Sequence, residues 1–252
     1  MNSSRLITRR RAIVMGLASA GGLFVAGRHK DLPPTYGNLL RMGDTLTYAA
    51  HRTLLPGEAL VREYTEKDVT SFPATGTTDP SASEKFPLSS AYRALKSGEF
   101  RDWRLSVEGS VARSQTFSLA DLKRLPSRTQ VTRHTCEEGW TAIGQWTGVP
   151  LSLVLNAAGI LPTARFVLFH SYDDWIDSID LLDALHPQTI LAYGMNGRDL
   201  SIPHGAPVRL RVERQLGYKS MKYLSRIVVT DEFADGGKKG NIENGWAWYT
   251  GI

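Results

Sequence analysis

The chain contains a single cysteine, Cys136, among its 252 residues. One thiol forms no internal disulfide and cannot supply the ligands of a four-cysteine metal site. An apolar core must therefore hold the fold together, and 42% hydrophobic against 22% charged residues suffice to build a sizeable one. The length favours one domain or at most two small ones. Any chemistry at Cys136 has to be done with one protein thiol.

The excess of positive over negative charge lies at the beginning of the chain. The formal net charge is +5 at pH 7, and residues 1–30 hold six lysines and arginines and no acidic residue. The rest of the chain holds 24 lysines and arginines against 25 acidic residues. Nucleic-acid binding depends on a strongly basic surface, and the main part of the chain is nearly neutral. A basic nucleic-acid-binding protein is therefore supported by the total charge alone, and we expect no nucleic-acid partner.

Residues 1–30 have the pattern of an export signal. Arg9, Arg10 and Arg11 precede an apolar stretch, 12–27, that is too short to span a bilayer comfortably. This order is typical of a twin-arginine signal and predicts a periplasmic protein. A basic helix on anionic lipid is the alternative. Because no clear A-x-A cleavage site follows, an uncleaved N-terminal anchor stays open, and we expect membrane contact only through this segment or a partner.

The rest of the chain divides into an arm and a domain. Prolines recur between Pro33 and Pro87, which predicts an irregular arm over 31–90 that packs on the core. Residues 91–252 form the domain, and Asn196-Gly197 within it is a strong hairpin signal. We expect helices at 118–125, 151–158 and 178–185, and strands at 103–109, 131–136, 165–170, 189–193, 199–202, 208–212 and 223–230. This mixture predicts an α+β fold.

Common catalytic motifs are missing from the sequence. There is no Walker A loop, no G-x-S-x-G elbow and no H-E-x-x-H motif. His134 and Cys136 are two residues apart, but no second cluster with zinc-ligand spacing accompanies them. Taken alone, a cysteine at the end of a strand is more often a small buried hydrophobe than a ligand.

Six short sequence stretches, which are called strings below, nevertheless resemble a known family in their order and spacing. The first of them contains Cys136. They are Thr132-Arg133-His134-Thr135-Cys136-Glu137-Glu138-Gly139-Trp140, Gly148-Val149-Pro150-Leu151, His186-Pro187, Leu191-Ala192-Tyr193-Gly194-Met195-Asn196-Gly197, His204-Gly205-Ala206-Pro207-Val208-Arg209 and Gly217-Tyr218-Lys219-Ser220-Met221-Lys222. In this the chain resembles the sulfite oxidase family of molybdopterin enzymes, over about residues 103–229. The resemblance implies a bacterial, exported, stand-alone molybdopterin-binding domain with mixed sheets and short helices.

The resemblance also implies a molybdenum–molybdopterin cofactor with one pterin. The pterin supplies two sulfur ligands, and Cys136 matches the position of the protein thiolate that binds the metal. A metal that cycles by two electrons needs soft, electron-donating ligands, which thiolates are. The lone cysteine is then sufficient for its task.

Further site residues follow from the same resemblance. Tyr193 matches a tyrosine near the metal, and Glu138 an acidic position that relays protons or orients the cysteine loop. The residues that match cofactor-binding positions are Ser171, His204, Arg209, Ser220, Met221, Lys222 and Thr75, the last standing where related sequences commonly have asparagine.

Departures from the family pattern bear on the substrate. In sulfite oxidases arginines line an anion pocket, whereas 72–76 and 137–141 contain none, and Glu137 and Glu138 follow the cysteine. Carboxylates there would repel sulfite. We therefore expect two-electron oxygen-atom transfer with a sulfoxide or similar oxo compound, either a small molecule or an oxidised side chain. The alternatives are a sulfite oxidase or dehydrogenase catalytic subunit, which Arg133 would assist from another side, and a non-catalytic cofactor-binding module.

The chain's organisation predicts an external electron carrier. The sequence continues only about twenty residues past the last expected strand, too few for the immunoglobulin-like dimerisation domain of longer family members. It contains no C-x-x-C-H haem motif. We expect a separate haem or cytochrome redox partner. The aromatic tail Trp246-Ala247-Trp248-Tyr249 is expected to pack back on the core.

Overall fold

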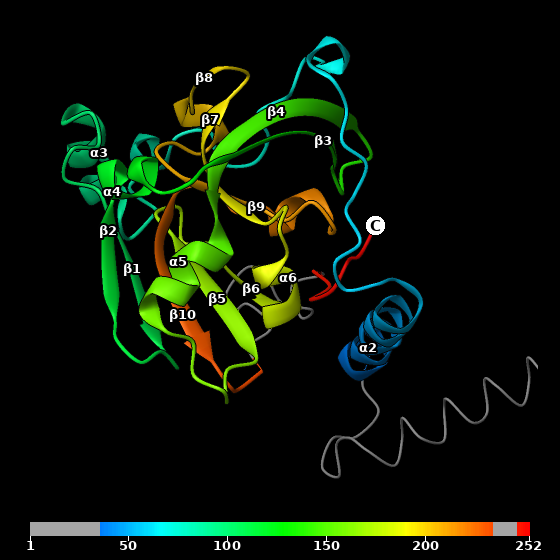
Figure 1. Cartoon of the computed structure of the whole chain (residues 1–252). Helices are drawn as coiled ribbons and strands as arrows, with labels where there is room; N and C mark the ends of the chain where they lie inside the picture. The colour runs from blue at the N-terminus through cyan, green and yellow to red at the C-terminus, as the bar shows by residue number, and fades with distance from the viewer. Residues whose placement is uncertain (1–35, 234–245) are drawn as a thin grey trace, which may run out of the picture. The chain divides into compact units, whose positions relative to one another are not determined.

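A computed structural model describes residues 36–233 and 246–252 (Figure 1). The predicted signal segment, 1–30, lies outside the described residues. The chain divides into two units, 1–39 and Leu40–Ile252, and all the elements below belong to the second unit except the first residues of α2. Within the described residues, no helix combines the length and the apolar character needed to cross a membrane.

The first sheet brings together strands from both halves of the chain (Figure 1). Its order is β2 (Gln115–Ser118), β1 (Arg104–Gly109), β10 (Leu224–Thr230), β5 (Phe166–Ser171) and β6 (Ile176–Asp180). Strands β1 and β10 are parallel, and the other neighbours are antiparallel.

The second sheet is antiparallel and carries the cysteine at one of its turns. Its order is β3 (Arg128–Thr135), β4 (Thr141–Pro150), β7 (Ile190–Met195) and β8 (Arg198–Asp199), and β9 (Arg209–Arg211) also pairs with β7. Thr135 pairs with Thr141, so Cys136 begins the turn between β3 and β4. Asn196 and Gly197 both have positive φ in the turn between β7 and β8, which confirms the predicted hairpin.

The helices are short, with one exception. They are α2 (Tyr36–Leu54), α3 (Ser89–Ser97), α4 (Leu119–Arg124), α5 (Leu151–Ala158) and α6 (Leu181–Leu185), with single 3-10 turns at Glu66–Asp68, Pro80–Ala82, Ile202–His204 and Gly217–Lys219. Helix α5 has the predicted bounds, with Gly159 left-handed at its C-terminus. Mixed sheets with few helices confirm the α+β class.

The larger of two apolar clusters in the described residues draws on both sheets. It takes Leu105 and Ile227 from the first sheet, Val149 and Leu191 from the second, and Leu155 from α5, all fully buried. Alternation along β1 places Leu105 and Val107 inward, as the sequence pattern predicts. The core therefore fixes both sheets, and the strand ends that carry the site are held by it.

The arm departs from its prediction chiefly at one long helix, and helix α3 also begins inside it, at Ser89. Residues 31–90 were expected to be irregular, yet 36–54 form the 19-residue helix α2. No proline interrupts this stretch, because the recurrent prolines stand before and after it. Tyr48 Oη donates to Asp180 Oδ2 at 2.7 Å, and Arg52 forms an ion pair with Asp180 at 2.8 Å. These contacts are made in the folded state only, so the local pattern does not show them.

A second correction concerns the helix predicted at 178–185. It begins only at Leu181, because 176–180 pair with β5 as strand β6. Asp180 ends the strand and caps the helix by accepting a hydrogen bond from Asp183 N at 2.8 Å. Strand β4 was not predicted, since Gly144, Gly148 and Pro150 obscure its pattern. A Cβ on Gly148 would lie 2.2 Å from Leu191 O, so the close approach to β7 requires glycine there.

The N-terminus of α4 gives a stability prediction. Ser118 Oγ accepts from Asp121 N at 3.1 Å, and Asp121 accepts from Ser118 N at 2.9 Å, forming a capping box at the start of the predicted helix. Ser118→Ala should lower the free energy of unfolding by about 1 kcal/mol, measured by urea denaturation. The exposed change Thr116→Ser on β2 is the control. An unchanged unfolding midpoint in Ser118→Ala would show that the cap contributes nothing to stability.

Candidate active site

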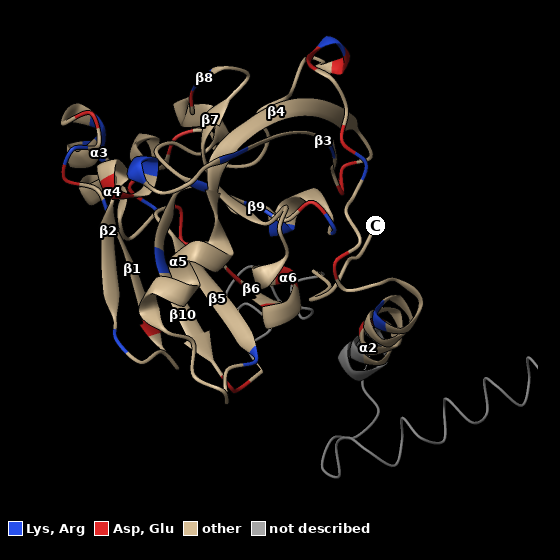
Figure 2. Ribbon diagram, in the orientation of Figure 1, with Lys and Arg blue, Asp and Glu red and all other residues tan. Residues whose placement is uncertain are grey.

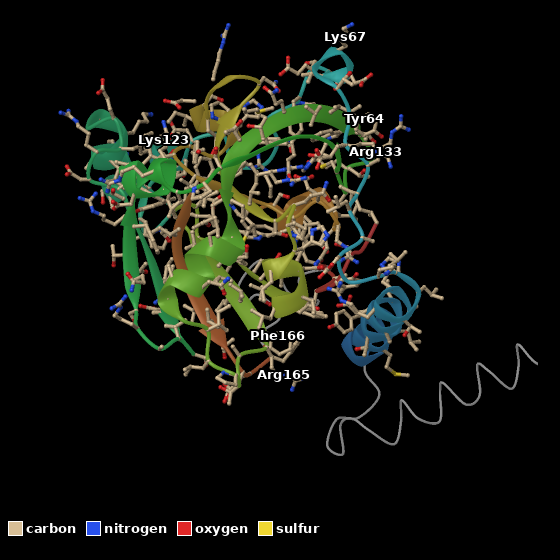
Figure 3. All side chains as sticks on the ribbon, in the orientation of Figure 1. Tyr64, Lys67, Lys123, Arg133, Arg165 and Phe166 are labelled. Atoms are coloured by element: carbon tan, nitrogen blue, oxygen red, sulfur yellow. The ribbon has the colours of Figure 1, made fainter. Side chains whose placement is uncertain are left out.

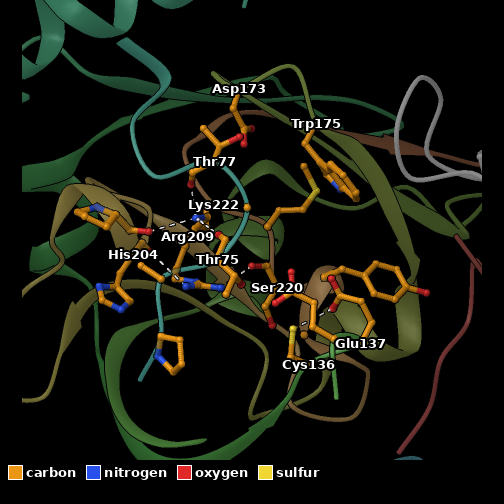
Figure 4. Close-up of a pocket in the computed structure, with 18 of the residues that line it drawn as sticks. Thr75, Thr77, Cys136, Glu137, Asp173, Trp175, His204, Arg209, Ser220 and Lys222 are labelled. Carbon is orange, nitrogen blue, oxygen red and sulfur yellow. Dashed lines mark hydrogen bonds between the residues drawn. The ribbon is translucent and has the colours of Figure 1, made fainter. Parts of the chain in front are cut away.

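A cavity of about 650 Å³ lies next to Cys136 (Figure 4). Its lining comes from segments that are far apart in the sequence: 72–77 and 85–86 of the arm, 134–140 around the cysteine turn, 173–175, 203–209, 217–222 and Trp246. Cavities of this size take a small-molecule ligand or a cofactor.

The turn after β3 positions the thiol. Cys136 N donates to Trp140 O at 2.9 Å and Gly139 N donates to Cys136 O at 3.1 Å, while Gly139 has a φ of +89° that favours glycine. Cys136 Sγ donates to Glu137 Oε2 at 3.3 Å. Burial, together with the Glu137 and Glu138 carboxylates, raises the pKa of the Cys136 thiol to about 11. A bound metal ion reverses this, because a coordinating thiol is deprotonated.

Two cations form another wall of the cavity. Arg209 is buried; it donates to His204 O at 3.0 Å and to Ser220 O at 2.8 Å, and its Nε has no hydrogen-bond partner. Burial and the neighbouring Arg211 lower the pKa of Arg209 to about 9. Lys222 lies close by, where burial and Arg209 lower its pKa to about 8. Desolvated positive charges beside an unsatisfied donor suit an anionic group such as a phosphate.

Lys222 is held by main-chain oxygens of the arm. Its Nζ donates to Thr75 O at 2.8 Å, to Pro203 O at 3.1 Å and to Thr77 O. Figure 4 shows Lys222 between Thr75, Thr77 and Arg209. Thr75 thus contributes its carbonyl oxygen to this network.

Other predicted residues also reach the cavity. His204 Nδ1 pairs with Ser201 Oγ at 2.9 Å and Nε2 with Phe72 O at 3.1 Å, and burial lowers the pKa of His204. Ser220 Oγ accepts from Val212 N at 3.2 Å. The cavity brings together eight of the predicted site residues: Thr75, Cys136, Glu138, His204, Arg209, Ser220, Met221 and Lys222.

Two predicted residues do not line the cavity. Tyr193 is half-buried on β7, with Lys123 Nζ 5.6 Å from its ring centre. Ser171 Oγ donates to Asp173 Oδ1 at 2.5 Å and accepts from Trp175 N at 3.0 Å. Ser171 therefore holds the 173–175 segment, which lines the cavity, without lining it itself. Arg133, labelled in Figure 3, is exposed and does not line the cavity either.

Sequence reasoning missed the aromatic part of the lining. Phe72 and Trp140 meet edge to face at 5.7 Å between ring centres, and Trp175, Tyr218 and Trp246 lie at the cavity as well. Trp140 and Tyr218 stand inside the quoted strings, but an aromatic residue in a string does not disclose which side of the chain it faces. The other three come from segments without a motif.

Comparison with known families decides the class of the site. Residues 93–237 match the family described as the oxidoreductase molybdopterin binding domain. The chain belongs to this family. Membership confirms the predicted class of molybdopterin oxidoreductase, and the sulfite oxidase resemblance with it.

Three relatives of the chain have names that refer to methionine sulfoxide reduction. YedZ1 of Azospira oryzae, named for a protein-methionine-sulfoxide reductase subunit, is 38% identical over 168 residues, or 66% of this chain and 63% of the relative. The protein-methionine-sulfoxide reductase catalytic subunits MsrP of Ralstonia nicotianae and Xanthomonas axonopodis pv. citri are 31% and 30% identical. These matches cover 52% and 90% of this chain, and 44% and 71% of the relatives. The chain thus spans under two thirds of two of these three relatives.

A solved structure shares the fold. The sulfane dehydrogenase SoxCD from Paracoccus pantotrophus superposes with a TM-score of 0.51 and 24% identity, over 55% of this chain and 40% of that one. At this identity the likeness concerns the fold alone, and it confirms the mixed-sheet architecture.

The residues present fit the family's cofactor. Cys136 offers one thiolate to a metal, and Arg209 Nε is a buried donor without a partner in the same cavity. Within residues 36–233 and 246–252, no three His, Cys, Asp or Glu side chains are grouped to hold a metal ion.

Lys222 provides a test of this fit. Lys222→Met should lower the retained molybdenum and pterin about tenfold after dialysis, because a charge-assisted contact to the cofactor is lost. Lys222→Arg keeps the charge and is the matched control. Metal analysis and pterin fluorescence measure the content, and full retention in Lys222→Met would contradict a contact with the cofactor.

Proposed function

We propose that the chain is the catalytic part of a methionine sulfoxide reductase that uses one molybdenum-bound pterin. The overall reaction is the two-electron reduction of a sulfoxide: R₂SO, two electrons and two protons give R₂S and water. The observation that carries the proposal is one cavity that contains the family's thiol, with carboxylates beside it, and two cations on another wall. The relatives' names support the choice of substrate.

The carboxylates favour a neutral substrate. Glu137, Glu138, Asp173 and Asp174 line the cavity, and Glu137 and Glu138 are exposed. Sulfite is an anion and is repelled by them, whereas a sulfoxide carries no net charge. Arg209 and Lys222, which would attract sulfite, are the cations that we assign to the cofactor, and this leaves Lys85 as the remaining lysine or arginine of the lining.

The chain's own residues have distinct tasks in this reaction. When bound, the cofactor supplies two-electron transfer coupled to oxygen-atom exchange. Cys136 would hold its metal, and Arg209 and Lys222 its phosphate. Glu138 Oε2 accepts from Trp140 Nε1 at 3.0 Å, which holds the carboxylate at the cavity for the predicted proton delivery. Tyr193 has no part in this scheme, because it lies off the cavity.

The electrons would come from another protein. The names of the relatives describe subunits, which supports an enzyme of more than one chain. We propose a membrane haem protein or a cytochrome as the donor, and a periplasmic location reached through the twin-arginine signal. Figure 2 shows Lys, Arg, Asp and Glu spread over many elements of the domain.

Turnover of two substrates tests the function. Enzyme matured in a molybdenum-replete host should prefer methionine sulfoxide, with a reduced dye, over sulfite, with oxidised cytochrome c, by at least about a hundredfold in kcat/KM. The isosteric change Asp174→Asn should raise the sulfite rate and leave the sulfoxide rate nearly unchanged. Faster turnover of sulfite by the unaltered enzyme would replace this proposal with the sulfite oxidase alternative. Turnover of neither substrate would support the non-catalytic module.

A further inference from the structure

The C-terminal tail places a tryptophan at the cavity. Trp246 lies with its ring centre 5.2 Å from that of Trp175 and 4.9 Å from that of Tyr218. All three residues are half-buried and line the cavity that contains Cys136. They come from three separate segments, and none of them has a task in the scheme above.

The tail is fixed by contacts on both sides. Asp44 on α2 accepts from Trp248 N at 2.7 Å and from Tyr249 N at 2.8 Å. Tyr218 Oη donates to Ala247 O at 2.6 Å, next to Trp246 itself. A helix of the arm and the segment after β9 thus hold the backbone that carries Trp246.

This arrangement suits one part of a sulfoxide. The sulfur of such a substrate has two organic substituents, and aromatic rings offer these alkyl groups a large apolar contact surface. The charged residues of the cavity have no such affinity for an alkyl group. Because rings on three segments meet at one point, they present more apolar contact than a single side chain could.

We infer that Trp246, with Trp175 and Tyr218, forms an aromatic subsite that binds the alkyl groups of the sulfoxide and sets substrate preference. The inference rests on the proposed function and adds the part of the site that recognises the substrate. Trp246 is the specificity-determining residue, and Asp44 is a positioning residue that acts through the tail.

Holoenzyme variants of the tail test this inference. Trp246→Ala should raise KM for methionine sulfoxide about tenfold, with kcat and molybdenum content nearly unchanged, because ring contacts with the substrate are lost. Trp246→Phe should recover most of the affinity. Dimethyl sulfoxide, which offers only methyl groups, should respond less to either change.

Two further variants separate recognition from general damage. Asp44→Asn should raise KM in the same direction by a smaller factor, again at constant kcat. Trp248→Phe is the matched control, because Trp248 donates to Ser178 Oγ at 3.0 Å and does not line the cavity. A KM that stays constant in Trp246→Ala, or that rises equally in Trp248→Phe, overturns the inference.

A binding measurement distinguishes failure of the subsite from failure of the proposed function. Titration calorimetry of the holoenzyme with N-acetyl-methionine sulfoxide should show about tenfold weaker binding in Trp246→Ala. Binding that depends on Trp246 without any turnover would support the subsite and overturn the reductase function. Turnover with binding that is independent of Trp246 would do the opposite. Absence of both binding and turnover in the unaltered enzyme would overturn both.

Discussion

Replacing Cys136 with serine should lower sulfoxide turnover by about a thousandfold or more. Mutation of a residue that only supports a metal ligand typically lowers metal affinity or activity about 10- to 100-fold. Cys136 is assigned as the ligand itself, so its loss should have a larger effect. A serine hydroxyl is a poor donor to a metal that needs soft ligands. Molybdenum content and steady-state turnover with a reduced dye measure the effect.

The fold should survive this change. Cys136 Sγ makes one hydrogen bond, to exposed Glu137, so the melting temperature of the metal-free variant should stay near that of the metal-free parent. The exposed strand change Thr116→Ser serves as the activity control. Full activity in Cys136→Ser would remove the cysteine from the metal site.

Replacing Lys219 with methionine should lower the free energy of unfolding by about 3–5 kcal/mol. Lys219 and Asp177 have side chains 0% and 2% exposed, and Nζ donates to Asp177 Oδ1 at 2.6 Å and to Ser178 O at 2.7 Å. Removing the cation leaves the Asp177 carboxylate buried and uncompensated. Because Lys219 directly precedes Ser220, the variant should also retain less cofactor. Chemical denaturation of the metal-free protein gives the stability.

The loss of unfolding free energy in Lys219→Met should depend on pH in a defined direction. Burial raises the pKa of Asp177 to about 6 even though Lys219 lowers it, so loss of Lys219 should raise that pKa further. A carboxyl group whose pKa is higher in the folded than in the unfolded state stabilises the fold at low pH. This stabilisation is lost as the pH rises through the folded-state pKa. The deficit of Lys219→Met should therefore be smaller near about pH 5 than near about pH 8.

A double variant supplies the control for this pair. Lys219→Met combined with Asp177→Leu removes both charges and should recover much of the lost stability, as replaced buried ion pairs commonly do. If the double variant is less stable than Lys219→Met alone, the uncompensated carboxylate is not the source of the deficit.

Local signals in the sequence predicted much of the fold. The helix at 151–158, the helix that begins next to Ser118 and the Asn196-Gly197 turn depend on neighbours in the chain and appear in the structure as expected. Helix α2 and strand β6 are fixed instead by partners far away, since Asp180 binds Arg52 across 128 positions. Such contacts leave no mark in a short window of sequence.

The residues of the candidate site were likewise predicted only in part. Residues of the strings around Cys136, Arg209 and Lys222 line the cavity because each string is a turn or strand end, where several consecutive residues can face one space. Tyr193 lies within a strand, and side chains alternate between the two faces there. A string match therefore finds the strand without fixing which face a side chain takes. Trp246 belongs to no string, and contacts of the tail with distant residues such as Asp44 and Tyr218 bring it to the cavity.

The segments that line the cavity lie far apart in the sequence, and this links cofactor loading to thermal stability. Walls drawn from the arm, the second sheet, the connecting loops and the tail exist together only in the native fold, so the unfolded chain offers no comparable binding site. A ligand that binds only the native state shifts the unfolding equilibrium by mass action, by about 2.7 kcal/mol at a hundredfold excess over Kd. Loaded enzyme should accordingly melt at a higher temperature than empty enzyme, and a partly loaded preparation should unfold in two separate transitions.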